Sequence, residues 1–338
     1  MRAFNSASNR FWKTDMDITC TEAIRTALSD AMDQDERVFL MGEDIGLYGG
    51  AFGVTRGLLE RFGEERVRET PISEAGFTGL AVGAAMAGAR PVVEIMFSDF
   101  MTLIADVMIN QAAKFRYMYG EQVSVPMVVR APSGGGRGYG PTHSQCMEAL
   151  FFGVPGLKVV SPSTPEDAYS LLVNAIRDPN PIVFSEAKSL YSMKGPLTKD
   201  LECAQIGSAT IERDGSDLTL ISYGPCMRIV RETADALAEK NIQAEVLDLR
   251  TVFPFDSETI LQSARRTSRV VIVEESPKWW GIGTRISAMI TEEAFFDLEA
   301  PPVTIAAKNS PVPSAESLEK QVLPDVNDII AAVRKVLE

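Results

Sequence analysis

Histidine is nearly absent from this chain of 338 residues, which contains a single one, His143. Imidazole is the only side chain whose ordinary pKa lies close to neutral pH. Any proton transfer near neutrality that needs an imidazole must therefore use His143. A lone histidine is more often a plain surface or core residue than part of a site, so the surrounding sequence has to decide between these two interpretations.

Cysteine is also scarce, with four residues at widely separated positions: Cys20, Cys146, Cys203 and Cys226. Their spacing excludes paired metal-binding motifs and a dense disulfide framework. It favours free, mostly buried thiols in a reducing compartment.

Clustered positive charge and long apolar runs are lacking as well. The formal net charge is -13, and nucleic-acid binding needs grouped Lys and Arg, so we expect no nucleic-acid partner. No apolar run approaches membrane-spanning length, and Met1 to Asp15 lacks the apolar core of a signal peptide. We therefore expect no membrane partner and a cytoplasmic location.

What is present is an alternation of short apolar runs with segments of helical period. This pattern is typical of parallel strands joined by crossover helices, and the length predicts two α/β domains. In the first half, a hydroxyl cap at Ser163-Thr164 is followed by Pro165 and by early acidic residues. This sequence predicts a helix that reaches about Arg177. The strands predicted there are Val38–Met41, Val92–Met96, Val125–Val129 and Pro181–Ser185.

The composition changes near Leu190 to Ile206, where Lys, Gly, Pro and Asp interrupt the apolar pattern. We therefore predict a domain over residues 1–190, a linker over 191–207 and a second domain over 208–338. The second domain repeats the alternation of strands and helices. Its predicted strands are Leu218–Ser222, Ala244–Leu249, Val270–Glu274 and Val303–Ala307, and its predicted helices are Met227–Glu239 and Val326–Leu337.

The segment from Thr70 to Phe77 introduces an unusually apolar stretch. Ser73 can cap a helix whose next turns, Gly76 to Ala89, are apolar on all sides, which predicts burial. The glycines within it would let another backbone approach closely, as at a domain or subunit interface. Glu74 would lie where burial begins, and its carboxylate either serves a site or simply complements the helix dipole.

Several ordered stretches now resemble one family over nearly the whole chain. The chain is similar to the β subunit of the thiamine-diphosphate-dependent first component of 2-oxo acid dehydrogenase complexes, of the pyruvate, branched-chain and acetoin types. The resemblance implies two three-layer parallel-sheet domains, an N-terminal pyrimidine-binding domain and a C-terminal transketolase-like domain. The matching stretches are Gly42-Glu43-Asp44, Thr70 to Glu74, Ala81 to Ala85, Arg90 to Glu94, His143-Ser144-Gln145, Pro155 to Val160 and Ala175 to Asp178.

The resemblance gives Glu74 a catalytic role. It implies that Glu74 hydrogen-bonds a ring nitrogen of the cofactor's aminopyrimidine and promotes the tautomer whose exocyclic nitrogen acts as a base. It further implies that Phe100 stacks on this ring, that Met96 and Glu43 line the cavity, and that Ile72 helps to hold the cofactor's reactive conformation. Without the resemblance, Phe100 and Met96 would be expected in the core.

His143 corresponds to the family histidine that comes near the substrate and the lipoyl sulfur, where it can donate a proton or stabilise charge. The glycine-rich loop before it, Gly134 to Gly140, differs from the common pyruvate-type versions, which leaves substrate choice open. Arg137 in this loop either binds a carboxylate or phosphate or faces solvent.

The resemblance also implies a structural potassium ion bound by backbone carbonyls. Carbonyl oxygens suit such a cation, although the turn Arg177 to Asn180 could equally be an ordinary connection. The implied ligands are Met127, Ala175, Ile176, Asp178 and Asn180.

One family element is missing: the Gly-Asp-Gly that begins the diphosphate and magnesium motif of thiamine enzymes does not occur. The resemblance then implies that a separate α subunit supplies Mg²⁺ and the diphosphate site. The expected assembly is an α2β2 heterotetramer that docks a lipoyl-bearing acyltransferase core, and the lone chain should be inactive.

The predicted function is thus oxidative decarboxylation of a 2-oxo acid, or cleavage of acetoin, with reductive acylation of lipoamide. Two alternatives stay open. One is a subunit of a split transketolase or acyloin-forming thiamine enzyme, and the other is a noncatalytic scaffold or electron-transfer subunit, because a fold alone does not fix function.

Overall fold

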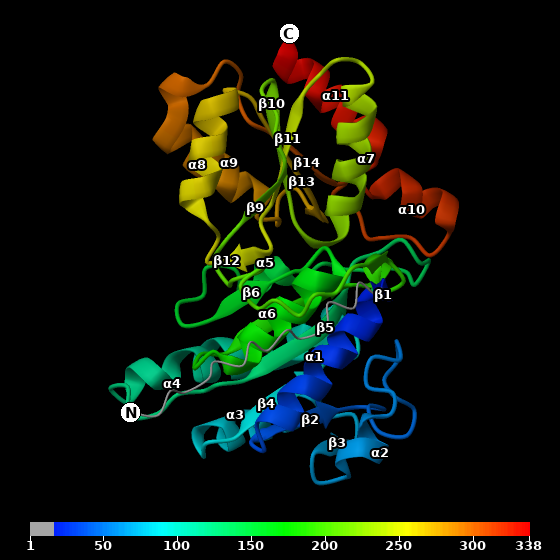
Figure 1. The fold of residues 1–338 in the computed structure, drawn as a ribbon, viewed down its shortest axis with the longest axis vertical. Coiled ribbons are helices and arrows are strands. Elements are labelled where there is room, and N and C mark those ends of the chain that lie inside the picture. Colours follow the sequence, from blue (N-terminus) through cyan, green and yellow to red (C-terminus); the bar gives the residue numbers. More distant parts are fainter. Residues whose placement is uncertain (1–16) are drawn as a thin grey trace, which may run out of the picture.

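Two sheets of mainly parallel strands form the framework of the chain, one above the other in Figure 1. The computed structural model describes residues 17–338, so the polar segment Met1 to Asp15 lies outside the described residues. A two-stranded antiparallel ribbon, β1 (Ile18–Thr19) with β8 (Lys194–Gly195), joins the start of the described chain to the segment that connects the sheets.

The N-terminal sheet has seven strands, and six of them run parallel. Their order is β12 (Thr251–Phe253), β6 (Lys158–Val160), β7 (Ile182–Ala187), β5 (Val128–Ser133), β4 (Arg90–Glu94), β2 (Val38–Gly42) and β3 (Val67–Glu69). Strands buried on both faces need apolar side chains throughout, and Val92, Val93, Val128 and Val129 meet this need.

Helices cover both faces of this sheet and make the first three-layer domain. One face packs against α1 (Cys20–Gln34) and α6 (Pro165–Arg177). The other face packs against α3 (Glu74–Met86), a 3-10 helix (Ser98–Ile104), a π-helix (Val107–Ala112), α4 (Ala113–Met118) and α5 (Glu148–Phe151). The short α2 (Leu58–Phe62) leads into β3.

The C-terminal sheet repeats this layering with five strands. Helices α8 (Ser257–Thr267) and α9 (Gly283–Ala294) cover one face, while α7 (Met227–Ala238) and α11 (Val326–Leu337) cover the other (Figure 1). Helix α10 (Glu316–Val322) lies beside the N-terminal domain. The strand order is β14 (Val303–Ala307), β13 (Val270–Pro277), β10 (Leu218–Ser222), β11 (Ala244–Asp248) and β9 (Thr210–Arg213), of which β9 is antiparallel.

The two domains share one apolar core. Val93 in β4 and Ile95 just after it belong to the same buried cluster as Ile221 and Ile272 of the C-terminal sheet. Residues 191–207 pack on the N-terminal domain: Ala204 is buried, and the side-chain amide of Asn174 in α6 donates to the carbonyls of Leu201 and Ala204. The connection is therefore an ordered part of the molecule.

Most predicted elements occur, and the exceptions have physical causes. Strand β5 begins three residues later than predicted and runs through Pro132, which the sheet tolerates because β4 pairs with β5 only as far as Arg130. Strand β4 ends at Glu94 rather than Met96. Strand β12 was not predicted; it comes from the second half of the sequence and closes the N-terminal sheet.

Candidate active site

The connections of the N-terminal sheet diverge between β2 and β4, the place where open parallel sheets form a ligand crevice. The chain leaves β2 toward β3 on one side and leaves β4 toward β5 on the other, so the connections diverge at this point. In open parallel sheets, ligands bind where such connections diverge, at the carboxyl ends of the strands. Gly42 pairs with Glu94 at this end, so Glu43 and Met96, just beyond the strands, lie at the same edge.

Two carboxylates meet at this edge. Glu43 follows β2, and Glu74 is the first residue of α3; both side chains are buried, with 8% of their surface exposed. Burial raises the pKa of Glu43 most, and the charge of Glu74 raises it further. Within residues 17–338, Oε1 of Glu43 has no hydrogen-bond partner. A buried, unsatisfied oxygen is costly and points to a polar ligand.

Helix α3 differs from the prediction in two respects. Ser73 occupies the N-cap position, but its hydroxyl donates to the Pro71 carbonyl and caps nothing. This chain alone does not bury the helix on all sides, because Leu80 is 67% exposed and Gly83 is exposed as well. Ile72, just before the helix, is 81% exposed. This exposed apolar face is larger than a single scattered side chain, and such faces are typical of protein–protein contact surfaces.

The structure brings His143 and Phe100 together. The two rings meet edge to face with centroids 5.3 Å apart, and Phe97 contacts the imidazole in the same way at 4.6 Å. Phe100 belongs to the 3-10 helix that follows β4, so this pair also lies beyond the carboxyl end of that strand. His143 is half-buried, and its Nδ1 lies 3.0 Å from the Thr142 hydroxyl.

The residues after His143 fasten its loop to the same 3-10 helix. The side-chain amide of Gln145 donates to Oδ1 of Asp99 at 2.8 Å, and the hydroxyl of Ser98 donates to the Gln145 carbonyl at 2.5 Å. Neighbouring residues of one short helix thus fix both Phe100 and the His143 segment. The second carboxylate oxygen of Asp99 is buried and has no partner among the described residues.

Lys188 is a site residue that the sequence analysis missed. It follows β7 directly, is fully buried, and its amino group donates to the His143 carbonyl at 2.8 Å while lying 5.3 Å from the Phe97 ring centre. Burial lowers the pKa of this amine. A lysine at the carboxyl end of a buried strand was the available signal, because buried lysines are rare unless they have a partner.

A second set that was missed lies beneath the site. Arg130 in β5 is 1% exposed; its guanidinium donates twice to Glu186 (2.6 and 2.9 Å) and once to Glu94 (2.7 Å), and the Tyr191 hydroxyl also donates to Glu186. Bidentate contacts of this kind are rigid. They connect β4, β5 and β7, the strands whose ends carry the site.

The five carbonyls proposed for potassium lie near the end of α6 and the starts of β5 and β7, but two of them already face a cation. One nitrogen of Arg90 donates to the Ile176 carbonyl at 2.6 Å and lies 3.3 Å from the Asp178 carbonyl. The Met127 carbonyl accepts from the Ile182 amide, and the Ala175 carbonyl accepts from the Asp178 amide. A potassium ion would therefore have to share these oxygens with a guanidinium, which is a poor fit.

Two kinds of feature are absent from the described residues. No group of three or more His, Cys, Asp or Glu side chains in residues 17–338 is arranged to hold a metal ion. None of the helices in this part of the chain is both long and apolar enough to cross a bilayer. The four cysteines are free.

Comparisons with known proteins identify the class. Residues 16–194 match the transketolase pyrimidine-binding domain, and residues 207–329 match the transketolase C-terminal domain. The chain therefore belongs to the transketolase-like proteins. A split-gene transketolase, solved as an inactive β4 tetramer, has a similar fold, with a TM-score of 0.77, 22% identity, and coverage of 95% of this chain and 99% of that one.

Curated relatives narrow the family further. Mitochondrial pyruvate dehydrogenase E1 subunit β-1 of Arabidopsis thaliana is 45% identical to this chain. The matched region spans 94% of this chain and 89% of the relative. The Rickettsia felis pyruvate dehydrogenase E1 subunit β is 44% identical, over 95% of this chain and 98% of the relative. The Bacillus subtilis 2-oxoisovalerate dehydrogenase subunit β is 43% identical, over 94% of this chain and 98% of the relative. The chain belongs to the β subunits of the thiamine-diphosphate-dependent 2-oxo acid dehydrogenases.

Proposed function

We propose that this chain forms one half of a shared active site that oxidatively decarboxylates a 2-oxo acid, or cleaves acetoin, and passes the acyl group to lipoamide. The observation that carries this proposal is the buried Glu43–Glu74 pair at the crevice between β2 and β4. The pyruvate and 2-oxoisovalerate dehydrogenase β subunits among the relatives support this substrate class.

The residues at the crevice suit an aminopyrimidine ring. Thiamine diphosphate, when bound, supplies the nucleophilic carbon and the electron sink for cleavage beside a carbonyl group. Glu74 would hold a proton at its carboxylate against a ring nitrogen, and Glu43, whose pKa burial raises, would line the cavity. Phe100 and Met96, both half-buried, would supply its apolar walls, and Ile72 would reach toward the cofactor from the exposed face.

His143 would act on the substrate side. Its imidazole is fixed by two aromatic rings and by the contacts of its loop. An oriented imidazole can donate a proton to a reacting oxygen or sulfur near neutral pH. The side-chain nitrogen Nη2 of Arg137 donates to the Lys188 carbonyl at 2.8 Å, so this arginine first supports the loop.

The site requires a second chain. Glu74 begins a helix whose outer face, including Leu80 and Gly83, is apolar and exposed. We propose that an α subunit covers this face in an α2β2 heterotetramer and brings Mg²⁺ and the diphosphate site. A lipoyl-bearing acyltransferase core would complete the complex.

Two finer points belong to the proposal. We propose a cytoplasmic location, in keeping with the free cysteines. Three relatives carry mitochondrial names, so fractionation of the native cells tests this location. Potassium stays a proposal despite the contacts of Arg90. An increase of the melting temperature in potassium chloride over choline chloride would support it, and equal values would refute it.

The experiment that tests the function is purification of the native assembly, followed by assays with a panel of substrates. An α2β2 mass with bound thiamine diphosphate and magnesium, and turnover of a 2-oxo acid or acetoin with lipoamide, is the expected result. Turnover only of sugar phosphates with aldehyde acceptors would favour a split transketolase. A homo-oligomer free of cofactor would indicate a scaffold or an electron-transfer subunit.

A further inference from the structure

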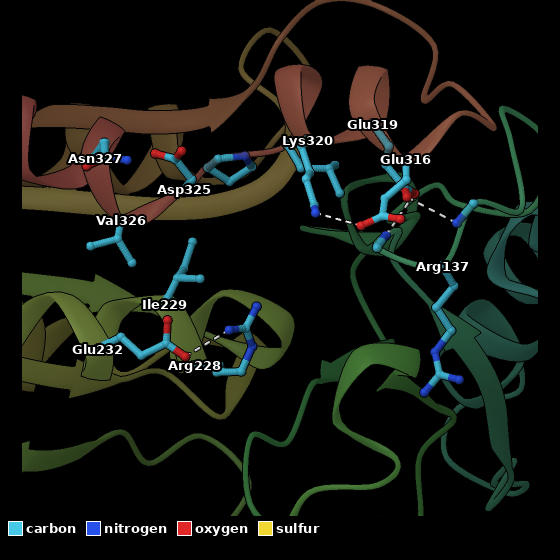
Figure 2. Close-up of a pocket in the computed structure, with 14 residues that line it drawn as sticks. Arg137, Arg228, Ile229, Glu232, Glu316, Glu319, Lys320, Asp325, Val326 and Asn327 are labelled. Atoms are coloured by element: carbon cyan, nitrogen blue, oxygen red, sulfur yellow. Dashed lines mark hydrogen bonds and ion pairs between the residues drawn. The ribbon is translucent and has the colours of Figure 1, made fainter.

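The glycine-rich loop that leads to His143 is held by the C-terminal domain. The Gly136 amide donates to Oε1 of Glu319 at 2.8 Å, and the Gly138 amide donates to Oε2 at 3.0 Å (Figure 2). Glu319 lies in α10 and is 3% exposed. Gly135 donates to Glu275 of β13. The buried carboxylate of Glu319 thus accepts from two amides of the loop, and the carboxylate of Glu275 accepts from a third amide.

The backbone of the loop is shaped for this contact. Gly136 and Gly138 have φ angles of 81° and 69°, in the left-handed region that side chains disfavour. A Cβ added to Gly138 would also lie 3.0 Å from the Ser314 carbonyl oxygen, just before α10. Backbone amides that converge in this way form a concave site for an anion. Here the anion is the Glu319 side chain.

The other end of the loop is fixed from the N-terminal domain. Lys188 donates to the His143 carbonyl, and Arg137 donates to the Lys188 carbonyl, each at 2.8 Å. In Figure 2 the Arg137 side chain extends away from Glu319. Residues 135–143 are therefore tied at one end to α10 and β13 and at the other end to Lys188.

The contacts of Glu319 differ from those of the other acidic residues around it. It borders a cavity of about 650 Å³ between the loop and helices α7, α10 and α11, and neither Glu43 nor Glu74 lines this cavity. The other ion pairs at this cavity, Glu316 with Lys320 and Arg228 with Glu232, stay within one helix each. Among the acidic residues that line this cavity, Glu319 is the one hydrogen-bonded to the loop.

We propose that Glu319 is a positioning residue, through which the C-terminal domain holds the loop so that His143 stays against Phe97 and Phe100. This inference rests on the proposed role of His143. Its consequence is that a residue far from His143 in the sequence, with no contact to the imidazole itself, governs the acyl-transfer side of the site.

The test is Glu319→Gln in the assembly with the α subunit. The amide group keeps one acceptor oxygen but turns an N–H donor toward the other glycine amide. We expect hydrogen exchange at Gly136 or Gly138, whichever amide then faces the N–H group, to accelerate about tenfold or more, because that amide loses its acceptor. We also expect lipoamide-dependent kcat to fall about tenfold while cofactor affinity and native mass stay unchanged.

The single histidine provides a direct readout that does not depend on activity. When this chain alone carries ¹³C at its histidine ring and is assembled with an unlabelled α subunit, the one labelled imidazole is that of His143. It should shift or broaden in Glu319→Gln. The matched control is Glu316→Gln, on the same helix but exposed and paired only with Lys320, which should leave the signal, the exchange and the kcat unchanged.

The outcomes separate the two proposals. If Glu319→Gln and Glu316→Gln give the same exchange rates and the same histidine signal, the positioning role is overturned, whatever the activity. If Glu74→Gln keeps full turnover, the proposed function fails, while exchange and the histidine signal still decide the role of Glu319. Should Glu319→Gln not assemble, Glu319→Asp applies the same readouts, because its shorter carboxylate withdraws from both amides.

Discussion

The buried carboxyl of Glu43 lies close enough to Glu74 that the charge of Glu74 adds to the effect of burial in raising the pKa of Glu43. The two side chains come from different elements, just after β2 and at the start of α3, and no Lys or Arg is among the groups that shift the pKa of Glu43. Such an arrangement costs stability in the lone chain, and costs of this kind are common at functional sites.

Glu43→Gln should therefore stabilise the isolated chain at alkaline pH. The pKa of Glu43 is raised on folding, so its contribution to stability is present below the unfolded pKa and is lost as the pH rises through the folded pKa. The melting temperature of the variant should exceed that of the wild type at about pH 8, and this advantage should vanish near pH 4. An equal difference at both pH values would show that Glu43 is not perturbed.

Glu274 should give the chain a second pH dependence near neutrality. Burial raises its pKa to about 7, although the amides of Ile282 and Gly283 at the start of α9 donate to it at 2.8 and 3.0 Å. The folded protein holds this proton more tightly, so stability falls as the pH rises from about 4.5 through about 7, by at most ~3 kcal/mol. In urea unfolding, the wild type should lose stability relative to Glu274→Gln between about pH 5 and pH 9. Parallel pH curves for the two proteins would contradict this.

Gly83→Leu should separate folding from assembly. A Cβ at Gly83 meets no other described atom within 4 Å, apart from the helix's own backbone and chain neighbours, and leucine favours helix over glycine by about 0.8 kcal/mol. The isolated chain should melt at the same temperature or higher, yet native mass should show no α/β assembly. Gly83→Ala, with one methyl group, should stabilise the lone chain and disturb assembly less. Normal assembly of Gly83→Leu would place the α subunit elsewhere.

Arg130→Met should be strongly destabilising. It would leave the carboxylates of Glu94 and Glu186 buried without a counter-charge, which costs about 3–5 kcal/mol in comparable cases. Arg228→Met is the control, because its pair with Glu232 is exposed and worth less than about 1 kcal/mol. Similar urea midpoints for the two variants would refute a structural role of the Arg130 cluster.

Periodicity and end signals predicted the framework well. Strands β10 and β14 and helix α11 have the predicted bounds, and the hydroxyl, proline and acidic residues at Thr164–Asp167 do begin α6. These elements follow local rules, so a local pattern is enough to find them. The antiparallel strand β12 was missed because its partner, β6, is distant in the sequence.

The site was only partly visible in the sequence. Glu74, Phe100 and His143 were proposed through the resemblance. Phe97 and Glu319 make contacts between distant segments that no local pattern encodes, and the only signal for Lys188 was its place after a buried strand. The exposed face of α3 has a similar explanation. An apolar helix must be covered, but the sequence alone does not say whether the cover belongs to the same chain.

The most direct test of the account is turnover by Glu74→Gln in the assembled α/β enzyme. Glutamine keeps the size of the side chain but cannot exchange the proton, so we expect native mass and cofactor content to stay unchanged while kcat falls by about 10²–10⁴. Turnover of the variant within a few-fold of the wild type would contradict the assignment of Glu74 and, with it, the proposed active site.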